Sequence, residues 1–255
     1  MSTNYCYSDY DSFAWIYNKH WGNIFLGKLI PAIEKLLLPH IPPDAHILDL
    51  CCGTGQLAKT LTERGYGITG VDGSDEMIRF ARENAPDAEF IVEDARYFRL
   101  PGAYHAAISA FDSLNHVMSI ADLAEVFRNT YNALVDGGLF MFDMNMEEAY
   151  RSEWKGSFGI VEDDHVCVVQ SSYSADEGIG RTEITIFHLL DREWRRSDLT
   201  LLQRCYSEQE ILSALSDIGF VDIHPYDAER GLGDILKRPG RTFFFCRKPA
   251  IASSC

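Results

Sequence analysis

Residues 47–57 read I-L-D-L-C-C-G-T-G-Q-L, and this stretch decides the fold. Its apolar beginning is typical of a buried strand ending at Asp49, and a helical stretch follows from Gln56. Between them, Gly53 and Gly55 lack the Cβ atoms that would keep a ligand away from the backbone, and the helix N-terminus offers oriented N–H donors. The stretch therefore predicts a strand, a ligand-binding turn and a helix.

A second acidic residue, Asp72, ends the next predicted strand, about 20 residues after the glycines. A carboxylate at this place can accept hydrogen bonds from both hydroxyls of a ribose. We therefore expect a nucleoside cofactor at the carboxyl edge of the sheet.

The kind of nucleoside cofactor follows from the surrounding residues. Residues 53–58, GTGQLA, fit the G-x-G-x-x-A pattern of dinucleotide sites. Three features oppose that interpretation. Asp49 before the glycines suits a cationic amine better than a pyrophosphate, a further acid, Asp94, follows the third predicted strand, and no basic residue in 47–57 could offset phosphates.

Strands and helices alternate through this part of the chain. We expect strands at 46–50, 67–71, 89–92, 106–110 and 139–143, with helices at 56–64, 74–84 and 121–134, the last ended by the D-G-G at 136–138. Such alternation implies right-handed βαβ units and a parallel sheet covered on both faces. The fold class is therefore α/β, with a doubly wound, mostly parallel sheet.

The N-terminal segment, residues 1–40, is aromatic and helical in pattern. Phe13, Tyr17 and Trp21 recur at spacings that place them on one helix face. This face either packs onto a core or forms a lid over a ligand, and the pattern does not separate the two.

The region after residue 155 has a different character. Long β-rich stretches at 165–173, 181–190 and 195–205, joined by hairpin-length turns, predict an antiparallel meander. A helix at 208–218 follows, with Ser207 and Glu210 in capping-box positions, and then strands at 221–225 and 242–246. We expect one domain over 1–255, made of the lid (1–40), the core (44–150), the meander as an insertion (155–206) and the final elements (207–248).

The amino-acid composition limits the classes of partner that the protein is expected to bind. The 255 residues contain 38 Asp and Glu against 23 Lys and Arg, a formal charge of −15. This acidity disfavours nucleic acids and anionic membrane surfaces. Seven cysteines without a CxxC pair predict neither a disulfide framework nor a metal site. No apolar run approaches the roughly 18 residues of a membrane span, and the polar, acidic N-terminus differs from a signal peptide. We therefore expect a cytoplasmic protein, and the meander offers a surface for a homodimer.

At these residues the sequence resembles the class I S-adenosylmethionine (SAM)-dependent methyltransferases. The resemblance covers roughly residues 10–145 and the C-terminal end, although Cys51 stands where the family often has Gly. It rests on five motifs in family-like order, ILDLCCGTG, VDGSDEMI, FIVEDARYFRLP, AFDSLNHV and ALVDGGLFMFD. It implies a seven-stranded Rossmann-like sheet, SAM as cofactor and S-adenosylhomocysteine (SAH) as product.

The resemblance also implies roles for individual residues. Those that would contact SAM are Asp49 at the methionine amino group, Gly53 and Gly55 along the methionyl and ribose side, Asp72 at the ribose hydroxyls, Gly73 and Met77 along the adenine, Asp94 at the adenine amino group with Ala95 beside it, and Phe111 under the methionine portion.

Within the family, the sequence is similar to the amino-sugar N-methyltransferases, which share the aromatic N-terminus, the 111–116 turn and the meander. In those enzymes residues matching His116 and Tyr10 face the acceptor amine, and one matching Tyr17 closes over SAM. Asn18 stands where the family often has Asp. His116 could equally cap a helix or belong to the core.

The resemblance implies methyl transfer to a small-molecule acceptor, more readily an amine than a hydroxyl. A histidine is the natural general base near neutral pH. An acidic run would also attract a cationic amine, although such runs are usually solvated faces: Glu147, Glu148, Glu153, Glu162, Asp163 and Asp164. The alternatives are an NAD-linked oxidoreductase and a non-catalytic SAM-binding module.

Overall fold

The computed structural model of the protein describes residues 10–231 and 239–250. Seven of its strands form one sheet in the order β10-β11-β5-β4-β1-β2-β3. They span β1 His46–Leu50, β2 Gly67–Asp72, β3 Glu89–Val92, β4 Tyr104–Ser109, β5 Leu134–Asn145, β10 Val221–Asp227 and β11 Arg241–Arg247. Strands β1 to β5 pair in parallel, and β11 runs antiparallel to both of its neighbours. The predicted doubly wound sheet is confirmed.

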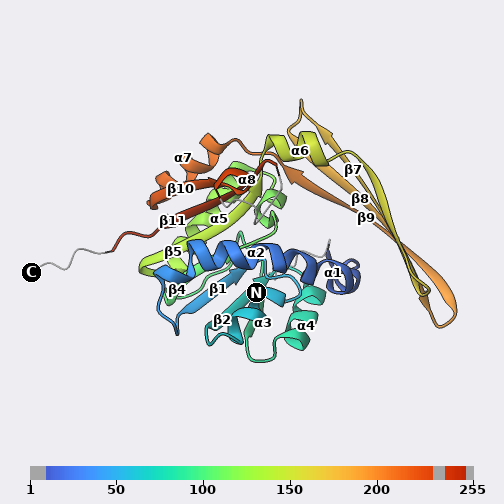
Figure 1. The fold of residues 1–255 in the computed structure, drawn as a ribbon, viewed down its shortest axis with the longest axis horizontal. Helices are drawn as coiled ribbons and strands as arrows, with labels where there is room; N and C mark the ends of the chain where they lie inside the picture. Colours follow the sequence, from blue (N-terminus) through green and yellow to red (C-terminus); the bar gives the residue numbers. More distant parts are fainter. Residues whose placement is uncertain (1–9, 232–238, 251–255) are drawn as a thin grey trace, which may run out of the picture.

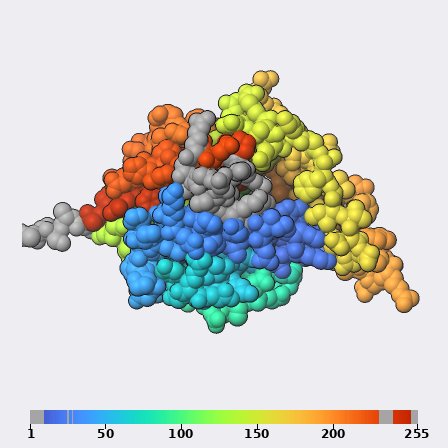
Figure 2. Space-filling model, in the orientation of Figure 1, coloured from blue at the N-terminus to red at the C-terminus, as the bar shows by residue number. Residues whose placement is uncertain are grey.

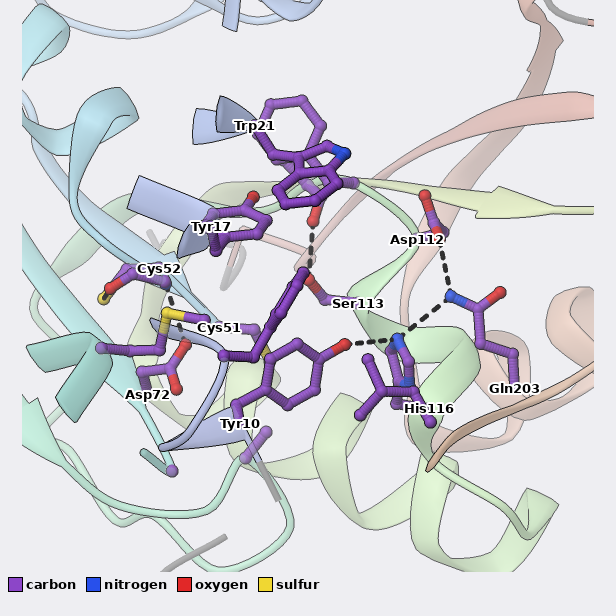
Figure 3. A pocket seen from close by; sticks show the side chains of 18 of the residues that line it. Tyr10, Tyr17, Trp21, Cys51, Cys52, Asp72, Asp112, Ser113, His116 and Gln203 are labelled. Carbon is purple, nitrogen blue, oxygen red and sulfur yellow. Dashed lines mark hydrogen bonds between the residues drawn. The ribbon is translucent and has the colours of Figure 1, made fainter. Parts of the chain in front are cut away.

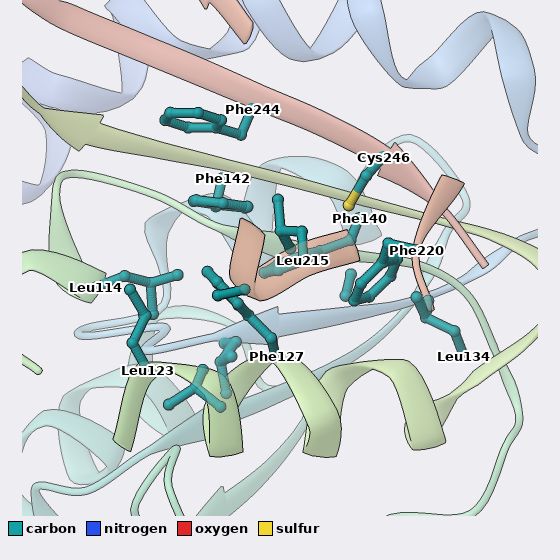
Figure 4. Close-up of a cluster of buried hydrophobic side chains, with 14 of the residues drawn as sticks. Leu114, Leu123, Phe127, Leu134, Phe140, Phe142, Leu215, Phe220, Phe244 and Cys246 are labelled. Atoms are coloured by element: carbon teal, nitrogen blue, oxygen red, sulfur yellow. The ribbon is translucent and has the colours of Figure 1, made fainter. Parts of the chain in front are cut away.

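Helices cover both faces of this sheet (Figure 1). The helical elements are α1 Ala14–His20, α2 Gly22–Leu36, η2 Leu38–His40, α3 Gln56–Thr62, α4 Asp75–Asn84, η3 Ser113–His116, α5 Ile120–Ala133, α6 Glu147–Glu153, α7 Glu208–Ile218 and α8 Ala228–Gly231. α2 and α3 bury Ile33 and Leu61 on one face. α5 and α7 bury Phe127 and Leu215 on the other, beside the ring of Phe142 (Figure 4). Each such side chain contributes roughly 1.5–3 kcal/mol by leaving water.

The meander forms a second, four-stranded antiparallel sheet in the order β6-β7-β8-β9, which projects beyond the first sheet (Figure 1). Its strands are β6 Gly156–Val161, β7 His165–Ser174, β8 Ile179–Leu190 and β9 Glu193–Arg204. The inner face packs on α1, where Phe13 and Ile16 meet Val169, Ile184 and Leu201. The N-terminal helix therefore lies between the second sheet and the rest of the molecule.

Most predicted element boundaries agree with the structure to within a few residues, and both predicted N-caps are present. Ser74 accepts from the backbone N–H of Met77, and Ser207 forms a full capping box with Glu210. The sequence analysis did not predict the short helices α6, α8 and η3 or the edge strand β6.

The helix before β5 ends within one residue of its predicted end, but the prediction that residues 136–138 terminate it was wrong. α5 ends at Ala133, and β5 begins at once and runs through Gly137 and Gly138. Gly137 has a positive φ of 78°, and its N–H donates to the carbonyl of Lys248, whose own N–H donates to Gly138. The two glycines therefore form an irregularity inside a strand, because β5 continues its pairing with the chain after β11.

Among the described residues, no helix is both long enough and apolar enough to cross a membrane.

Candidate active site

A cavity of about 470 Å³ lies at the carboxyl ends of the parallel strands, between the first sheet, α1 and the second sheet. Of the residues predicted to form the site, eleven line it: Tyr10, Tyr17, Asp49, Gly53, Asp72, Gly73, Met77, Asp94, Ala95, Phe111 and His116. The exception is Gly55. It begins α3 with φ at 80°, and a Cβ there would lie 2.9 Å from the Cα of Ala81. Gly55 is therefore required for the close packing of α3 on α4.

The turn after β1 is held by Asp72 at the end of β2. The N–H of Gly53 donates to Oδ2 of Asp72 at 2.8 Å, and the N–H of Ser74 donates to Oδ1 at 3.0 Å. Each carboxylate oxygen can accept a second hydrogen bond. Cys51 has a left-handed φ of 58°, which explains why glycine suits this position.

Asp49 carries an uncompensated carboxylate. It is 2 % exposed, and its Oδ2 is buried without a hydrogen-bond partner in the structure. Burial, together with the nearby charge of Asp72, raises its pKa from 3.8 to about 8. Because a buried charge without a partner is costly, this oxygen fits a cationic ligand group.

Asp94 is already paired with a cation. Arg96 donates to it from Nη2 at 2.6 Å, from Nε at 2.9 Å and from its backbone N–H at 2.8 Å. These bonds use two acceptor positions on Oδ1 and one on Oδ2, so Oδ2 can accept from one further donor.

The face of α1 that carries Phe13, Tyr17 and Trp21 lines the cavity, with ring centroids 5.9 Å apart for Phe13–Tyr17 and 5.2 Å for Phe13–Trp21. The opposite side, with Ala14 and Ile16, is fully buried. The helix therefore packs into a core with one face and covers the cavity with the other.

Hydrogen bonds fasten this N-terminal segment to α3, to α4 and to the turn that follows β2. Oδ1 of Asn18 accepts from Gln56 in α3 at 2.8 Å and from Asn84 in α4 at 2.7 Å. Ser74 donates to Asp11 at 2.5 Å, next to Asp72. An aspartate at position 18 could accept the same two hydrogen bonds, so Asn18 can replace the aspartate that the family often has there.

His116 lies at the other end of the cavity. Its Nδ1 is 2.8 Å from the carbonyl oxygen of Leu202, which can only accept, so Nδ1 carries the proton. Its Nε2 is therefore an acceptor, 2.8 Å from Oη of Tyr10 and 3.0 Å from Nε2 of Gln203 (Figure 3). Burial lowers the pKa of His116, against a smaller opposite effect of Asp112.

The turn that carries His116 is held by buried charges that the sequence analysis missed. Phe111 and Asp112 both have left-handed φ angles, 62° and 51°, and both of their N–H groups donate to Asp143. Arg241 bonds Asp112 and Asp143 together. Gln203 also donates to Asp112 at 2.6 Å. Asp112 and Asp143 stood inside the quoted motifs, whereas Gln203 and Arg241 follow no motif.

The acidic run between β5 and β7 is a solvated face. All six of its carboxylates are exposed, and none of them lines the cavity.

Asp49→Asn should weaken the dependence of ligand-free stability on pH. The folded protein holds a proton on Asp49 up to about pH 8, whereas the unfolded chain releases it near pH 4. Stability therefore falls as the pH rises through this window. Between about pH 6 and about pH 8, the melting temperature should fall less steeply in the variant than in the parent and in Asp87→Asn, an exposed control. Parallel curves for all three proteins would contradict the burial of an uncompensated carboxyl at Asp49.

The comparisons with known proteins agree with this geometry. Residues 47–138 match the family described as methyltransferase domain. The protein named "Putative methyltransferase YqeM" of Bacillus subtilis (strain 168) is 26% identical over 244 residues, 94% of this chain and 97% of that protein. The dTDP-3-amino-3,6-dideoxy-alpha-D-glucopyranose N,N-dimethyltransferase of Streptomyces fradiae is 30% identical over 159 residues, 62% of each chain.

An O-methyltransferase is also similar. The ubiquinone biosynthesis O-methyltransferase of Xanthomonas campestris pv. campestris (strain B100) is 26% identical over 160 residues, 58% of this chain and 65% of that protein. In fold, a SAM-dependent methyltransferase from Clostridium acetobutylicum ATCC 824 superposes with a TM-score of 0.75 at 22% identity, covering 94% of this chain and 99% of that one. These findings set aside the dinucleotide interpretation of residues 53–58. The chain therefore contains a methyltransferase domain and has the fold of a SAM-dependent methyltransferase.

Proposed function

We propose that this methyltransferase acts on an amine nitrogen of a small molecule, with His116 as the general base and Tyr10 beside it. The observation that carries the proposal is the state of His116 Nε2. This nitrogen is the unprotonated one of the ring, because Nδ1 faces a carbonyl oxygen, and it belongs to a half-buried residue that lines the cavity and whose pKa is lowered by desolvation. A neutral imidazole at this place is ready to accept a proton at neutral pH.

The charge of the cavity supports a cationic acceptor. Arg96 is the one Lys or Arg among the described lining residues, and it is bound to Asp94. Five lining residues are acidic: Asp49, Asp72, Asp94, Asp112 and Asp122. A cavity of one sign raises the local concentration of ligands of the opposite sign.

The energy of proton transfer also favours nitrogen. An ordinary amine has a pKa of about 10.4 against about 6.5 for histidine, a gap of roughly 5 kcal/mol. An alkyl hydroxyl, with a pKa near that of water at about 15.7, would roughly double this gap. The pKa of a phenol exceeds that of histidine by about as much as the pKa of an amine does. Deprotonation would, however, create a phenolate anion among carboxylates, which repel it. A hydroxyl acceptor, as named for the Xanthomonas relative, is the second candidate.

The residues at the other end of the cavity fit SAM. The partnerless oxygen of Asp49 suits the methionine amino group, and the free acceptor positions of Asp72 suit the ribose hydroxyls. Asp94 retains an acceptor position for the adenine amino group. A Cβ on Gly53 would point toward Tyr17, 3.7 Å from its ring, so the glycine leaves this space free. Along this path we place Gly73, Met77, Ala95 and Phe111 as further contacts.

The protein has little chemistry of its own to supply. Bound SAM provides a methyl group already activated by its sulfonium. The chain has to hold the acceptor nitrogen in line with that group, exclude water and remove one proton. The aromatic face of α1 excludes water, and His116 Nε2 receives the proton.

Asp72→Ala should lower the affinity for SAH by about 10²–10⁴-fold, because two charge-assisted hydrogen bonds of roughly 1.5–3 kcal/mol each are lost. Titration calorimetry measures the effect. Asp87→Ala removes the same charge at an exposed position of the α4–β3 loop and should bind SAH like the parent. Equal affinities for all three proteins would remove Asp72 from the cofactor site.

The N-terminal segment is proposed to act as a lid over SAM. Tyr10 and Asp11 bond to opposite ends of the cavity, to His116 and to Ser74, so closing the segment closes both ends together. Amide hydrogen exchange over residues 10–22 should slow when SAH is added, whereas exchange in α7, remote from the cavity, should not change. Maximal protection in the absence of SAH would identify the segment as permanent core.

A methyl-transfer screen over amines, amino sugars and hydroxylated metabolites tests the proposed function. The product should carry the new methyl group on nitrogen. With the accepted substrate, His116→Ala should lower kcat by about 10²–10⁴-fold while SAH affinity stays near that of the parent. His224→Ala, an exposed histidine on β10, is the matched control.

Three outcomes of this screen contradict the proposal. Methylation at oxygen excludes the amine acceptor, and parental turnover in His116→Ala excludes the base. SAH binding with no turnover of any substrate in the screen favours the non-catalytic SAM-binding module.

A further inference from the structure

Both ring nitrogens of His116 are bonded by neighbouring residues of one strand in the second sheet. The carbonyl of Leu202 accepts from Nδ1 at 2.8 Å, and the side chain of Gln203 lies 3.0 Å from Nε2. Both residues belong to β9, and Gln203 is 6 % exposed. The meander therefore contacts the proposed base as well as closing the cavity.

The orientation of the Gln203 amide follows from its partners. Nε2 of Gln203 lies 2.6 Å from Oδ2 of Asp112, and a carboxylate accepts only. The amide nitrogen must therefore face Asp112 and His116. On the other side, Oη of Tyr150 donates to Oε1 of Gln203 at 3.1 Å (Figure 3 shows the Asp112–Gln203–His116–Tyr10 chain).

The orienting hydroxyl of Tyr150 is itself fixed by close packing. Tyr150 lies on α6 and is 1 % exposed. Its ring packs over Gly180, which pairs with Gln203 in the register of β8 and β9. A Cβ on Gly180 would lie 2.7 Å from a ring carbon of Tyr150. Only a glycine leaves room for the tyrosine to reach the amide.

We propose that Gln203, oriented by Tyr150 and Asp112, is a positioning residue that keeps His116 Nε2 unprotonated and aimed into the cavity until the acceptor's proton arrives. The inference rests on the proposed role of His116. One amide N–H donates to Asp112, and the other donates to Nε2. Because that bond needs the lone pair of Nε2, it favours the neutral ring.

The same arrangement decides where the transferred proton goes. Once Nε2 carries a proton it must donate, and the amide nitrogen of Gln203 has no lone pair to accept with. Oη of Tyr10, at 2.8 Å, can accept. Protonated His116 therefore exchanges its Gln203 bond for one to Tyr10. The proton leaves the acceptor nitrogen and stays on Nε2 until it passes to solvent.

Gln203→Met tests the inference, because methionine has a similar length and no donor. The His116 ring is titrated by NMR in the SAH-bound protein, which requires no acceptor. Other ionisable groups around the ring are Tyr10, Asp112 and Tyr150, with Arg241 and Asp143 behind Asp112, and all of them are unchanged in the variant. The loss of one hydrogen bond should raise the His116 pKa by about 0.5–1 unit.

The pH profile of kcat gives a second readout, which a purely structural residue would not move. Its acid limb should shift upward by the same interval in Gln203→Met. Tyr150→Phe keeps the packing and removes only the orienting hydroxyl, so it should shift both readouts in the same direction by less. Gln170→Met, at an exposed position of β7, should shift neither.

An unchanged His116 titration in both Gln203→Met and Tyr150→Phe would overturn the inference even if His116→Ala is inactive. If His116→Ala retains parental turnover, the proposed base itself fails, and Gln203 then positions no catalytic group. A shifted titration together with a shifted acid limb supports the inference.

Discussion

The His116 end of the cavity depends on one ion cluster, in which Arg241 joins Asp112 to Asp143. Two consecutive left-handed residues, Phe111 and Asp112, are unfavourable without glycine. The Asp143 carboxylate stabilises this turn by accepting both of their N–H groups, and Arg241 pairs with the carboxylates of both Asp112 and Asp143. Removing one member of such a cluster leaves an uncompensated charge, which costs about 3–5 kcal/mol. The position of His116 follows from this turn.

A second constraint fixes the turn to both sheets. Asn115 is fully buried, and its amide donates to the carbonyls of Asn145 in β5 and Arg204 in β9, while its oxygen accepts from the N–H of Asn145. These are backbone groups at strand ends, where the sheet ladder leaves them without partners. The second sheet is thus joined to the core at the residue next to His116. A displacement of β9 would therefore also displace His116, the proposed base.

The sequence analysis anticipated the residues around Asp49 and Asp72 in the cavity far better than those around His116. Asp49, Gly53 and Asp72 lie at strand ends within one stretch of local βαβ pattern, so their spacing alone brings them together. Gln203 and Arg241 reach His116 and Asp112 from strands about 90 and 130 residues away. The hydrophobic periodicity of a sequence does not predict such long-range hydrogen bonds, because side-chain contacts between sheets depend on how the sheets pack. Gly55 matched a ligand-binding pattern, although its close neighbour is Ala81.

The distribution of charge along the cavity links its two ends in the proposed reaction. Before transfer, the positive charge resides on the sulfonium; afterwards it resides on the methylated nitrogen. Asp49 and Asp72 lie at one end of the cavity and Asp112 at the other. Burial, together with the nearby charges of Asp112, Asp72 and Asp49, raises the pKa of Tyr17. Tyr17 therefore stays protonated between them and adds no negative charge of its own. Because Asp112 is held by Arg241 and Gln203 before any ligand binds, the carboxylate that meets the arriving charge needs little reorganisation, which is the condition for electrostatic stabilisation of a transition state.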